Sequence, residues 1–376
     1  MSDALATEIR TDPAVVRRVE RALADLRRGE PVLLYEPGAA ALVLAAEQPS
    51  EEALTELGEL AGGAALLLLT ARRALALGIE GTAQGEIVAL EVSGVSTRGI
   101  IELADPTNSR LPRPAEPPRL GRAPGGLGPA AVSLVKLARL LPAAVLSPLI
   151  PQDENPAQWA TARDLLSLAA NDIGEYRFAG ARSLTRVAEA RLPLAGAETT
   201  RVVAFRPGDG GKEHLALVIG EPQPGESVLV RLHSECLTGD LLGSLRCDCG
   251  DQLRGAIEAI NGAGAGILLY LSQEGRGIGL VNKLRAYQLQ DHGADTAEAN
   301  EQLGFDADER IYLPAAGILR QLGFHRVRLL TNNPHKVTGL AHCGVTVEER
   351  VPHAFPSNGH NDFYLATKAA RFGHRF

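Results

Sequence analysis

The segment RLHSECLTGDLLGSLRCDCGDQL occupies residues 231–253 and places cysteines at positions 236, 247 and 249. Thiolates are soft ligands that favour zinc over the hard cations. Three protein ligands leave the fourth tetrahedral position open for water, which is the arrangement of a catalytic zinc site rather than a structural one. The spacing therefore predicts a zinc ion bound by Cys236, Cys247 and Cys249, with a water that the ion activates near neutral pH.

Two alternatives remain open at this point. The three cysteines could be reduced thiols of a hydrophobic core, although two cysteines that bracket a carboxylate and precede a glycine are more typical of a tight turn around an ion. A closed structural zinc site is the second alternative, with His233 or Cys343 as the fourth ligand. Cys343 lies on a helical pattern far along the chain, and we interpret it as a core thiol.

The residues around and after this segment alternate between strand-like and helix-like patterns. Short apolar runs predict strands at residues 227–232, 266–271, 327–330 and 345–348. Apolar residues at helical spacing predict helices at residues 251–261, 280–291, 314–322 and 335–342. This alternating order is typical of an α/β domain.

The N-terminal half contains a second set of elements, and its fold class is again α/β or α+β. Residues 13–29 predict a helix, because they open with proline, carry apolar side chains at near-helical spacing and end at glycine. Further helices are predicted at residues 130–141 and 157–170, and strands at residues 32–35, 41–45, 64–69 and 87–92. Residues 104–129 are rich in Pro, Gly and Arg and predict a long loop. We place the domain boundary near Gly180, which gives two domains, 1–180 and 181–376.

Composition limits what the chain can do. Its 376 residues are 45% hydrophobic and 22% charged, which is enough apolar material for two folded cores. The net charge of −7 argues against a general nucleic-acid binder, so an anionic ligand has to meet a local basic cluster. No apolar run approaches the ~20 residues that span a bilayer, and the first residues show no signal-peptide pattern. We therefore expect a cytoplasmic protein with no nucleic-acid and no membrane partner.

Long motifs surround the cysteines in a fixed order: HSEC-x-TGD, RCDCG-x-QL, QEGRGIGL, NK-x-RAY-x-LQD, ADER and LLTNNP-x-K. From about Thr185 to the C-terminus they resemble GTP cyclohydrolase II, the first enzyme of riboflavin synthesis. The resemblance implies zinc-dependent hydrolysis of GTP to 2,5-diamino-6-(5-phosphoribosylamino)pyrimidin-4(3H)-one, formate and pyrophosphate. It also implies one zinc ion per subunit, magnesium bound with the triphosphate, and a homodimer.

The same resemblance implies roles for individual residues. Cys236, Cys247 and Cys249 fall on the zinc ligands. The family's GTP-contacting positions correspond here to Arg231, His233, Ser234, Glu235, Gln252, Glu274, Gly275, Arg276, Thr296, Thr331 and Lys336. The chemistry of these residues agrees, because a triphosphate needs several cationic donors and a carboxylate such as Glu274 can accept hydrogen bonds from guanine.

Three further positions match catalytic residues of the family. Asp308 falls on the general base, and Arg310 on a proposed nucleophile that takes the guanylyl group. Because a guanidinium stays protonated in proteins, stabilisation of transition-state charge is the physically easier role for Arg310. Tyr287 falls on a tyrosine that positions groups for the hydrolysis that releases formate; the alternative is an aromatic residue that packs on its own helix. Ser272 departs from the family, in which arginine is common at this position.

The N-terminal half resembles 3,4-dihydroxy-2-butanone 4-phosphate synthase, the usual fusion partner of this enzyme, in degenerate form. The carboxylate-rich loop of that synthase is shortened here to YEPGAAALV at residues 35–43. Its GHTEA motif corresponds to GLGPA at residues 126–130, which leaves Leu127 for the metal-binding histidine and Pro129 for the catalytic glutamate. Such a site lacks the oxygen ligands of a divalent cation, so we predict a non-catalytic domain that serves dimerisation or stability.

Two other functions compete with GTP hydrolysis to the full set of products. A paralogue of the family could stop at a formylated product or serve another pathway. From a different class, the chain could be a non-catalytic nucleotide-binding subunit in which the zinc is structural. Retention of Tyr287 and of the whole C-terminal set of motifs favours the hydrolase.

Overall fold

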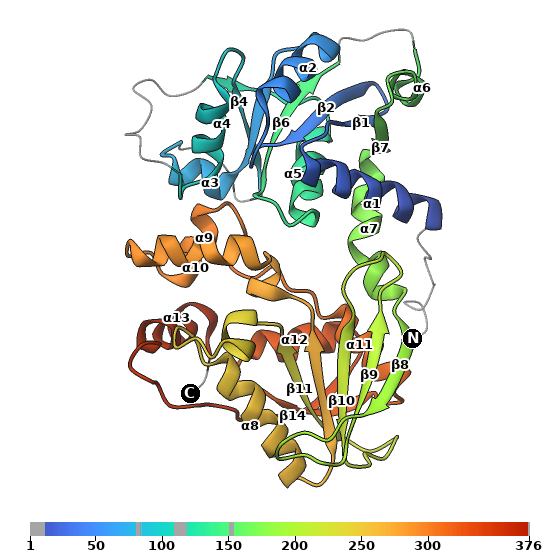
Figure 1. The fold of residues 1–376 in the computed structure, drawn as a ribbon, viewed down its shortest axis with the longest axis vertical. Coiled ribbons are helices and arrows are strands. Elements are labelled where there is room, and N and C mark those ends of the chain that lie inside the picture. The colour runs from blue at the N-terminus through green and yellow to red at the C-terminus, as the bar shows by residue number, and fades with distance from the viewer. Residues whose placement is uncertain (1–11, 80–82, 84, 109–118, 150–153, 375–376) are drawn as a thin grey trace. The chain divides into compact units, whose positions relative to one another are not determined.

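The computed structural model describes residues 12–79, 83, 85–108, 119–149 and 154–374 (Figure 1). The chain forms two compact units, each built around its own seven-stranded sheet. The first unit comprises Met1–Ala179, Leu284–His292 and Glu298–Ala307, and the second comprises Gly180–Lys283, Gly293–Ala297 and Asp308–Phe376. The predicted α/β class with two domains is confirmed. No helix in the described ranges is long and apolar enough to cross a membrane.

The sheet of the first unit has the strand order β5-β4-β3-β6-β2-β1-β7. Its neighbours pair antiparallel, except β1 and β7, which run parallel. The strands are β1 (Val32–Glu36), β2 (Ala39–Ala45), β3 (Leu66–Thr70), β4 (Ile87–Glu91), β5 (Leu120–Gly121), β6 (Ala143–Pro148) and β7 (Leu166–Ala169). The helices are α1 (Pro13–Arg28), α2 (Glu51–Ala61), α3 (Ala71–Ala76), α4 (Thr97–Ala104), α5 (Leu127–Leu137), α6 (Pro156–Thr161) and α7 (Ala170–Arg182), the last of which ends in the second unit.

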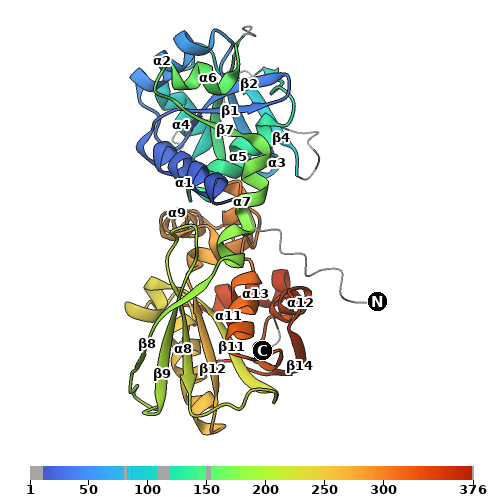
Figure 2. The same ribbon diagram turned by 90° about the vertical axis from the view of Figure 1, so that its right-hand side faces the viewer.

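Helices cover both faces of this sheet. The apolar sides of α1, α5 and α7 pack on one face, and those of α2, α4 and α6 pack on the other (Figure 2). Helix α1 follows its sequence signals, because Asp12 caps its N-terminus and Gly29 ends it in the left-handed conformation. The helix predicted at residues 157–170 is wrong. Pro156–Thr161 is helical there, but Leu166–Ala169 forms β7, whose backbone pairs with β1, and the next helix begins only at Ala170.

The sheet of the second unit has the strand order β14-β13-β11-β12-β10-β9-β8. The strands β14, β13, β11 and β12 run parallel to one another, and the pairings from β12 through β10 and β9 to β8 are antiparallel. The strands are β8 (Thr185–Arg191), β9 (Thr200–Arg206), β10 (His214–Ile219), β11 (Val228–Ser234), β12 (Gly266–Leu271), β13 (Arg326–Leu330) and β14 (Thr346–Val351). The carboxyl ends of four parallel strands therefore meet at one edge, where α/β proteins place their ligands.

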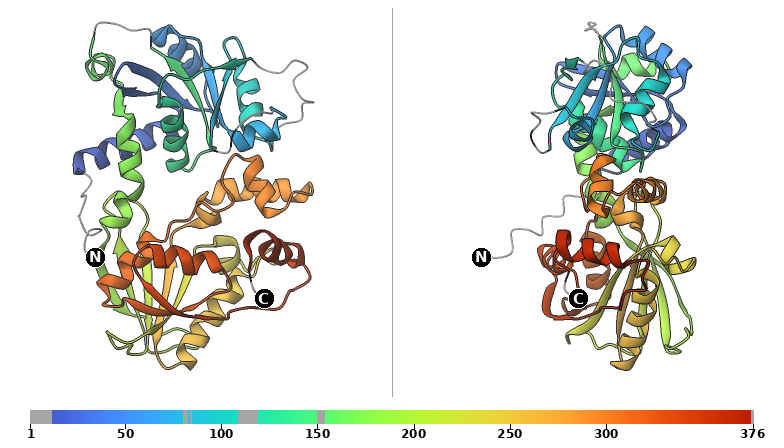
Figure 3. Two further views of the ribbon diagram at one scale, coloured as in Figure 1. Left: turned by 180° about the vertical axis from the view of Figure 1, so that it is seen from behind. Right: turned by 90° about the vertical axis from the view of Figure 1, so that its left-hand side faces the viewer.

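Helices also cover both faces of the second sheet. Helix α8 packs on one face, and α11 and α12 pack on the other (Figures 1 and 3). The remaining bounds are α8 (Cys249–Gly262), α9 (Leu280–Asp291), α10 (Thr296–Gln302), α11 (Leu313–Gln321), α12 (Pro334–His342), α13 (Asp362–Phe372), a π-helical turn at Leu237–Leu241 and a 3-10 turn at Glu274–Gly277. Helix α9 begins in the second unit and continues in the first, with the division after Lys283.

Candidate functional site

The three cysteines predicted to bind zinc come together at the carboxyl end of β11. Cys236 follows the strand, and Cys247 and Cys249 lie where α8 begins. Their sulfur atoms all lie within 4.8 Å of one another, and the Sγ atoms of Cys236 and Cys247 are 3.9 Å apart. Tetrahedral zinc with Zn–S bonds of ~2.3 Å separates its sulfur ligands by ~3.8 Å, so the geometry fits this ion. No histidine, carboxylate or fourth cysteine of the described ranges completes the group, which therefore offers three ligands.

Two glycines allow this close approach of sulfur atoms. A Cβ atom at Gly239 would lie 2.8 Å from the Cys247 sulfur and 3.1 Å from the Cys236 sulfur. At Gly250, a Cβ atom would lie 2.5 Å from the Gly239 carbonyl oxygen. Neither backbone position has room for a side chain. The glycines of TGD and RCDCG thus shape the centre without contributing a ligand.

Lys283 is a cation of the centre that the sequence did not single out. Its Nζ atom donates hydrogen bonds to Cys236 Sγ at 3.1 Å, Thr238 Oγ1 at 2.8 Å and Glu274 Oε1 at 2.9 Å. Hydrogen bonds from the other two thiols, and the charge of Lys283, lower the pKa of Cys236. A thiolate is the form that binds a metal ion. The NK pair of the NK-x-RAY motif was the available signal for this residue.

Asp240 organises the other side of the cysteine loop. Its carboxylate accepts hydrogen bonds from the Cys236 backbone N–H at 3.0 Å and the Tyr270 hydroxyl at 2.9 Å. The Nε2 atom of buried His233 lies 3.0 and 3.1 Å from its two oxygen atoms. Burial lowers the pKa of His233, which keeps the imidazole neutral at pH 7. Because a carboxylate only accepts, Nε2 carries the proton, and the buried Nδ1 is an acceptor with no partner among the described residues.

A buried polar chain connects the central strand with the C-terminal helix. Arg231 donates to the side-chain oxygen of Gln252, and to the Leu330 carbonyl at 2.9 Å. The Gln252 amide donates to Asp248 at 2.5 Å, and Lys368 on α13 donates to the same carboxylate at 2.6 Å. Burial lowers the pKa of Arg231 to about 10, so the guanidinium stays charged at neutral pH. Its Nε atom is buried and lacks a partner in the described part of the chain.

Asp308 and Arg310 form a bidentate ion pair. The guanidinium donates to the two carboxylate oxygens, with distances of 2.8 Å from Nε and 2.5 Å from one terminal nitrogen. Burial alone raises the pKa of Asp308 and lowers that of Arg310, but the pairing outweighs burial in both. The net pKa of Asp308 is lowered and that of Arg310 is raised. Both groups are therefore ionised at neutral pH.

The turn with the EGRG sequence packs against Glu309, the residue between the two members of this ion pair. Gly275 and Arg276 both have φ near 62°, a left-handed conformation that is uncommon for arginine. A Cβ atom at Gly277 would lie 3.0 Å from the backbone of Glu309. The Arg276 guanidinium stacks over Phe372 of α13 at 4.0 Å. Glu274, expected at the guanine, accepts hydrogen bonds from Lys283, from its neighbour's N–H and from the Leu237 N–H at 2.7 Å.

The remaining predicted residues lie at several places. Lys336 is buried in the first turn of α12 and donates to the Leu232 carbonyl at 2.7 Å, and Thr331 is buried after β13. Ser234 ends β11, and Glu235 accepts a hydrogen bond from Ser272 at 2.9 Å. Thr296 begins α10 within the second unit. Tyr287 lies on α9 in the first unit. The roles of all of these residues stay predictions.

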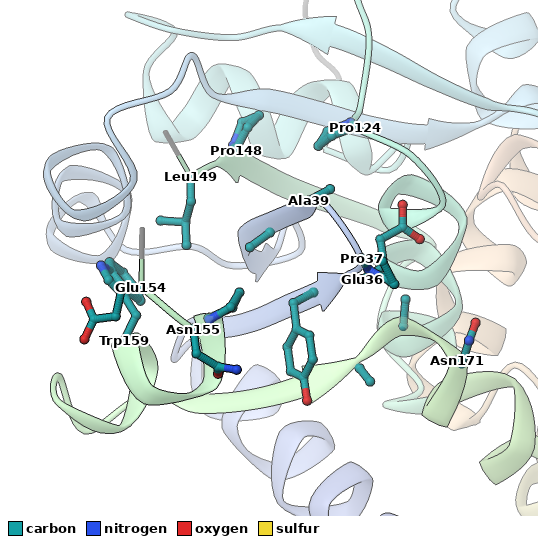
Figure 4. Close-up of a pocket in the computed structure, with 16 residues that line it drawn as sticks. Glu36, Pro37, Ala39, Pro124, Pro148, Leu149, Glu154, Asn155, Trp159 and Asn171 are labelled. Atoms are coloured by element: carbon teal, nitrogen blue, oxygen red, sulfur yellow. The ribbon is translucent and has the colours of Figure 1, made fainter. Parts of the chain in front are cut away.

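The first unit has a pocket of about 640 Å³ at its shortened loop (Figure 4). The lining includes residues 35–40, together with Pro124, Leu149, Asn155 and Trp159, and contains no lysine, arginine or histidine among the described residues. Glu36 accepts a hydrogen bond from the Gly126 N–H at 2.8 Å, at the start of α5. A carboxylate at a helix N-terminus is stabilised there by the helix dipole. The described lining of this pocket therefore offers no cationic side chain to a phosphate group.

Together, the fold and the site define an α/β protein whose second unit carries a cluster of three thiols that could hold a metal ion, together with several buried cations. The sequence model for GTP cyclohydrolase II matches residues 185–352. GTP cyclohydrolase-2 of Azospirillum brasilense is 54% identical over 370 residues, which cover 97% of this chain and 95% of that protein. The chain belongs to the GTP cyclohydrolase II family, hydrolases of riboflavin biosynthesis, and the predicted family is confirmed.

Two further proteins show the range of the similarity. Riboflavin biosynthesis protein RibBA of Bacillus mycoides (strain KBAB4) is 47% identical over 251 residues, which cover 65% of this chain and 63% of that protein. Among solved structures, RibBX of A. baumannii, a two-domain 3,4-dihydroxy-2-butanone 4-phosphate synthase, covers 90% of this chain and 100% of its own at 21% identity, with a TM-score of 0.36.

Proposed function

We propose that the protein hydrolyses GTP to 2,5-diamino-6-(5-phosphoribosylamino)pyrimidin-4(3H)-one, formate and pyrophosphate. Cys236, Cys247 and Cys249 would hold one zinc ion, which when bound supplies the activation of water that opening of the guanine ring requires. Magnesium would accompany the triphosphate. The observation that carries this proposal is a group of buried cations in the unit that holds the thiols, in a chain with a net charge of −7. The group consists of Arg231, Lys283, Lys336 and Lys368.

The charged form of Lys336 is disfavoured by its buried surroundings and its cationic neighbours. Burial lowers the pKa of Lys336 well below its ordinary value, and the charges of Arg231 and Arg310 lower it further. Arg231 and Lys336 each donate to one backbone carbonyl, at Leu330 and Leu232, and Arg231 also donates to the neutral side chain of Gln252. A triphosphate offers stronger, charge-assisted acceptors than these carbonyls. Binding of GTP would therefore relieve the repulsion and stabilise the charged form of the lysine.

His233 is suited to recognise a donor group on the substrate. Asp240 fixes the Nε2–H tautomer, so the buried Nδ1 presents a lone pair that has no partner within the described ranges. Leaving a buried acceptor unpaired costs ~1–3 kcal/mol, which a bound N–H or O–H group would recover. Guanine and ribose both offer such donors. We assign His233 to binding of the nucleoside part of GTP rather than to its phosphates.

Asp308 and Arg310 would exchange partners during the reaction. While Asp308 is paired, its lowered pKa makes it a poor base. When a phosphate group competes for the Arg310 guanidinium, the carboxylate loses its partner and its pKa rises, so it can accept a proton. Arg310 would stabilise the charge of the leaving pyrophosphate. A nucleophilic role would require deprotonation, which the raised pKa of this guanidinium opposes.

The first unit would carry no synthase activity, because the described residues of its pocket offer no cation for a phosphate and Glu36 is engaged by the start of α5. We further propose that the protein works in the cytoplasm as a homodimer. Tyr287 would position groups for the hydrolysis that releases formate.

One experiment tests the central proposal. Purified protein is incubated with GTP and magnesium, formate and pyrophosphate are quantified, and bound zinc is measured by mass spectrometry. Cys247→Ser should abolish both products and lower the zinc content. The matched control is Cys343→Ser, which removes the one cysteine outside the cluster and should leave activity and zinc unchanged. Release of pyrophosphate without formate from the wild-type protein would refute the proposed products.

A further inference from the structure

Helix α9 joins the cysteine centre to the first unit within three residues. Lys283 is the last residue of α9 in the second unit, and the Nζ atom of Lys283 lies 3.1 Å from Cys236 Sγ. Arg285, two residues later, belongs to the first unit. An α-helix rises ~1.5 Å per residue, so these two positions are ~3 Å apart along one rigid axis. Whatever fixes Arg285 therefore limits where Lys283 can be.

Arg285 is fixed by two carboxylates of the first unit. It forms ion pairs with Asp105 at 2.9 Å and Glu47 at 3.1 Å, and its side chain is only 13% exposed. Asp105, 2% exposed, also accepts hydrogen bonds from the backbone and side chain of Thr107. Glu47 accepts one from the Leu141 N–H at 2.8 Å. The two acids are therefore held in place before they meet the arginine.

Residues 298–307, which lead to Asp308, are held by the first unit in the same way. Arg72 pairs with Glu301 at 2.5 Å and with Asp306 at 3.0 Å. The Thr70 hydroxyl donates to the Gly304 carbonyl at 2.8 Å, and a Cβ atom at Gly304 would lie 2.8 Å from that hydroxyl oxygen. Two segments of the cyclohydrolase sequence thus fold as part of the N-terminal unit.

We propose that the N-terminal unit, for which we propose no synthase activity, serves as the anchor of α9 for the cysteine centre. Asp105 and Glu47 are then positioning residues: through Arg285 they hold the helix that presents Lys283 to Cys236. This inference rests on the proposed function only for its effect on catalysis, because the effect on the metal centre is measurable without turnover.

The test uses the full-length, zinc-loaded protein with Asp105→Asn or Glu47→Gln. Residues that orient a metal ligand from outside the coordination sphere typically change metal affinity or activity ~10–100-fold. We expect zinc release to a chelator to become about tenfold faster, and kcat for formate release to fall about tenfold with KM for GTP little changed. The matched control is Asp172→Asn, which breaks the Arg18–Asp172 ion pair of the first unit without touching α9.

A double-mutant cycle separates positioning from general destabilisation. If Asp105 acts through Lys283, the effects of Asp105→Asn and Lys283→Gln on zinc release combine to less than their product. The inference would be overturned if the effects of the two substitutions on the rate of zinc release simply multiplied. It would also be overturned if Asp105→Asn folded and released zinc at the same rate as Asp172→Asn. If Asp105→Asn does not fold, Arg285→Lys replaces it, because lysine keeps the positive charge but lacks the guanidinium that pairs with both carboxylates. Zinc release from Arg285→Lys should also be faster than from the wild type, by a smaller factor. Faster zinc release in a protein that does not hydrolyse GTP would refute the proposed function and leave this inference standing.

Discussion

The packing of thiols around Gly239 gives a quantitative prediction for Gly239→Ala. The added methyl group would lie 2.8 Å from Cys247 Sγ, whereas ordinary contacts begin at 3.4 Å. The sulfur, or the backbone that carries it, must therefore move by about 0.6 Å, three times the ~0.2 Å tolerance of a zinc–ligand distance. Overpacking of this kind costs ~1–3 kcal/mol, and each 1.4 kcal/mol corresponds to a tenfold change in an equilibrium constant. We expect zinc affinity to fall about 10- to 100-fold.

Competition between the protein and a chelator of known affinity measures this effect at one pH. The matched control is Gly262→Ala at the end of α8, where an added Cβ atom meets nothing within 4 Å. That variant should bind zinc like the wild type and unfold at the same temperature or slightly higher, since alanine favours helices. Zinc affinity of Gly239→Ala equal to that of the control would show that the thiols do not close around this glycine as described.

Three further predictions follow from the site and from the first unit. Burial lowers the pKa of His353 to about 4, so as the pH falls the unfolded state binds the proton before the folded state does. The free energy of unfolding should therefore decrease by up to roughly 3 kcal/mol between about pH 6.5 and pH 4. Denaturant titrations measure this loss, which should be smaller in His353→Gln. Arg310→Lys should lower kcat/KM about 100-fold, roughly 2.7 kcal/mol, because lysine lacks the planar fork; unchanged kinetics would remove Arg310 from the mechanism. The purified protein should form no 3,4-dihydroxy-2-butanone 4-phosphate from a sugar phosphate with magnesium, and detectable product would contradict the reading of the N-terminal pocket.

The cysteine cluster was predictable from sequence because its ligands are local. Cys236, Cys247 and Cys249 fall within one short segment, so their spacing already restricts how far apart the thiols can be. Lys283 was not found in this way, because it reaches Cys236 only after β12 and the EGRG turn bring α9 back to the centre. Lys368 is further still, 120 positions along the chain from Asp248. Contacts of that kind depend on the fold of the whole unit.

The errors in secondary structure have a similar cause. Residues 157–170 contain enough alanine and leucine to suggest one helix, but β1 offers a parallel partner for Leu166–Ala169 and pairing with it decides the conformation. The sequence did not predict strand β8. All seven of its side chains are exposed, so its sequence lacks the alternation of apolar and polar residues that identifies a half-buried strand. Its place in the sheet comes from antiparallel pairing with β9, which no pattern within β8 itself reveals.

Sequence motifs predict which residues belong to the site, and the structure shows which partners those residues already have. The hydrogen-bonding groups of Glu274, Asp308 and Lys336 are engaged by protein groups at 2.5–2.9 Å. GTP would therefore have to replace hydrogen bonds that these groups already make within the protein. The free energy gained from each replacement is only the difference between the new interaction and the old one. The lone pair of His233 Nδ1 and the Nε–H of Arg231 are exceptions, since both are buried without a partner among the described residues. A ligand that pairs with them recovers their full desolvation cost, so we expect these two atoms, rather than the more numerous paired groups, to contribute most to discrimination among nucleotides.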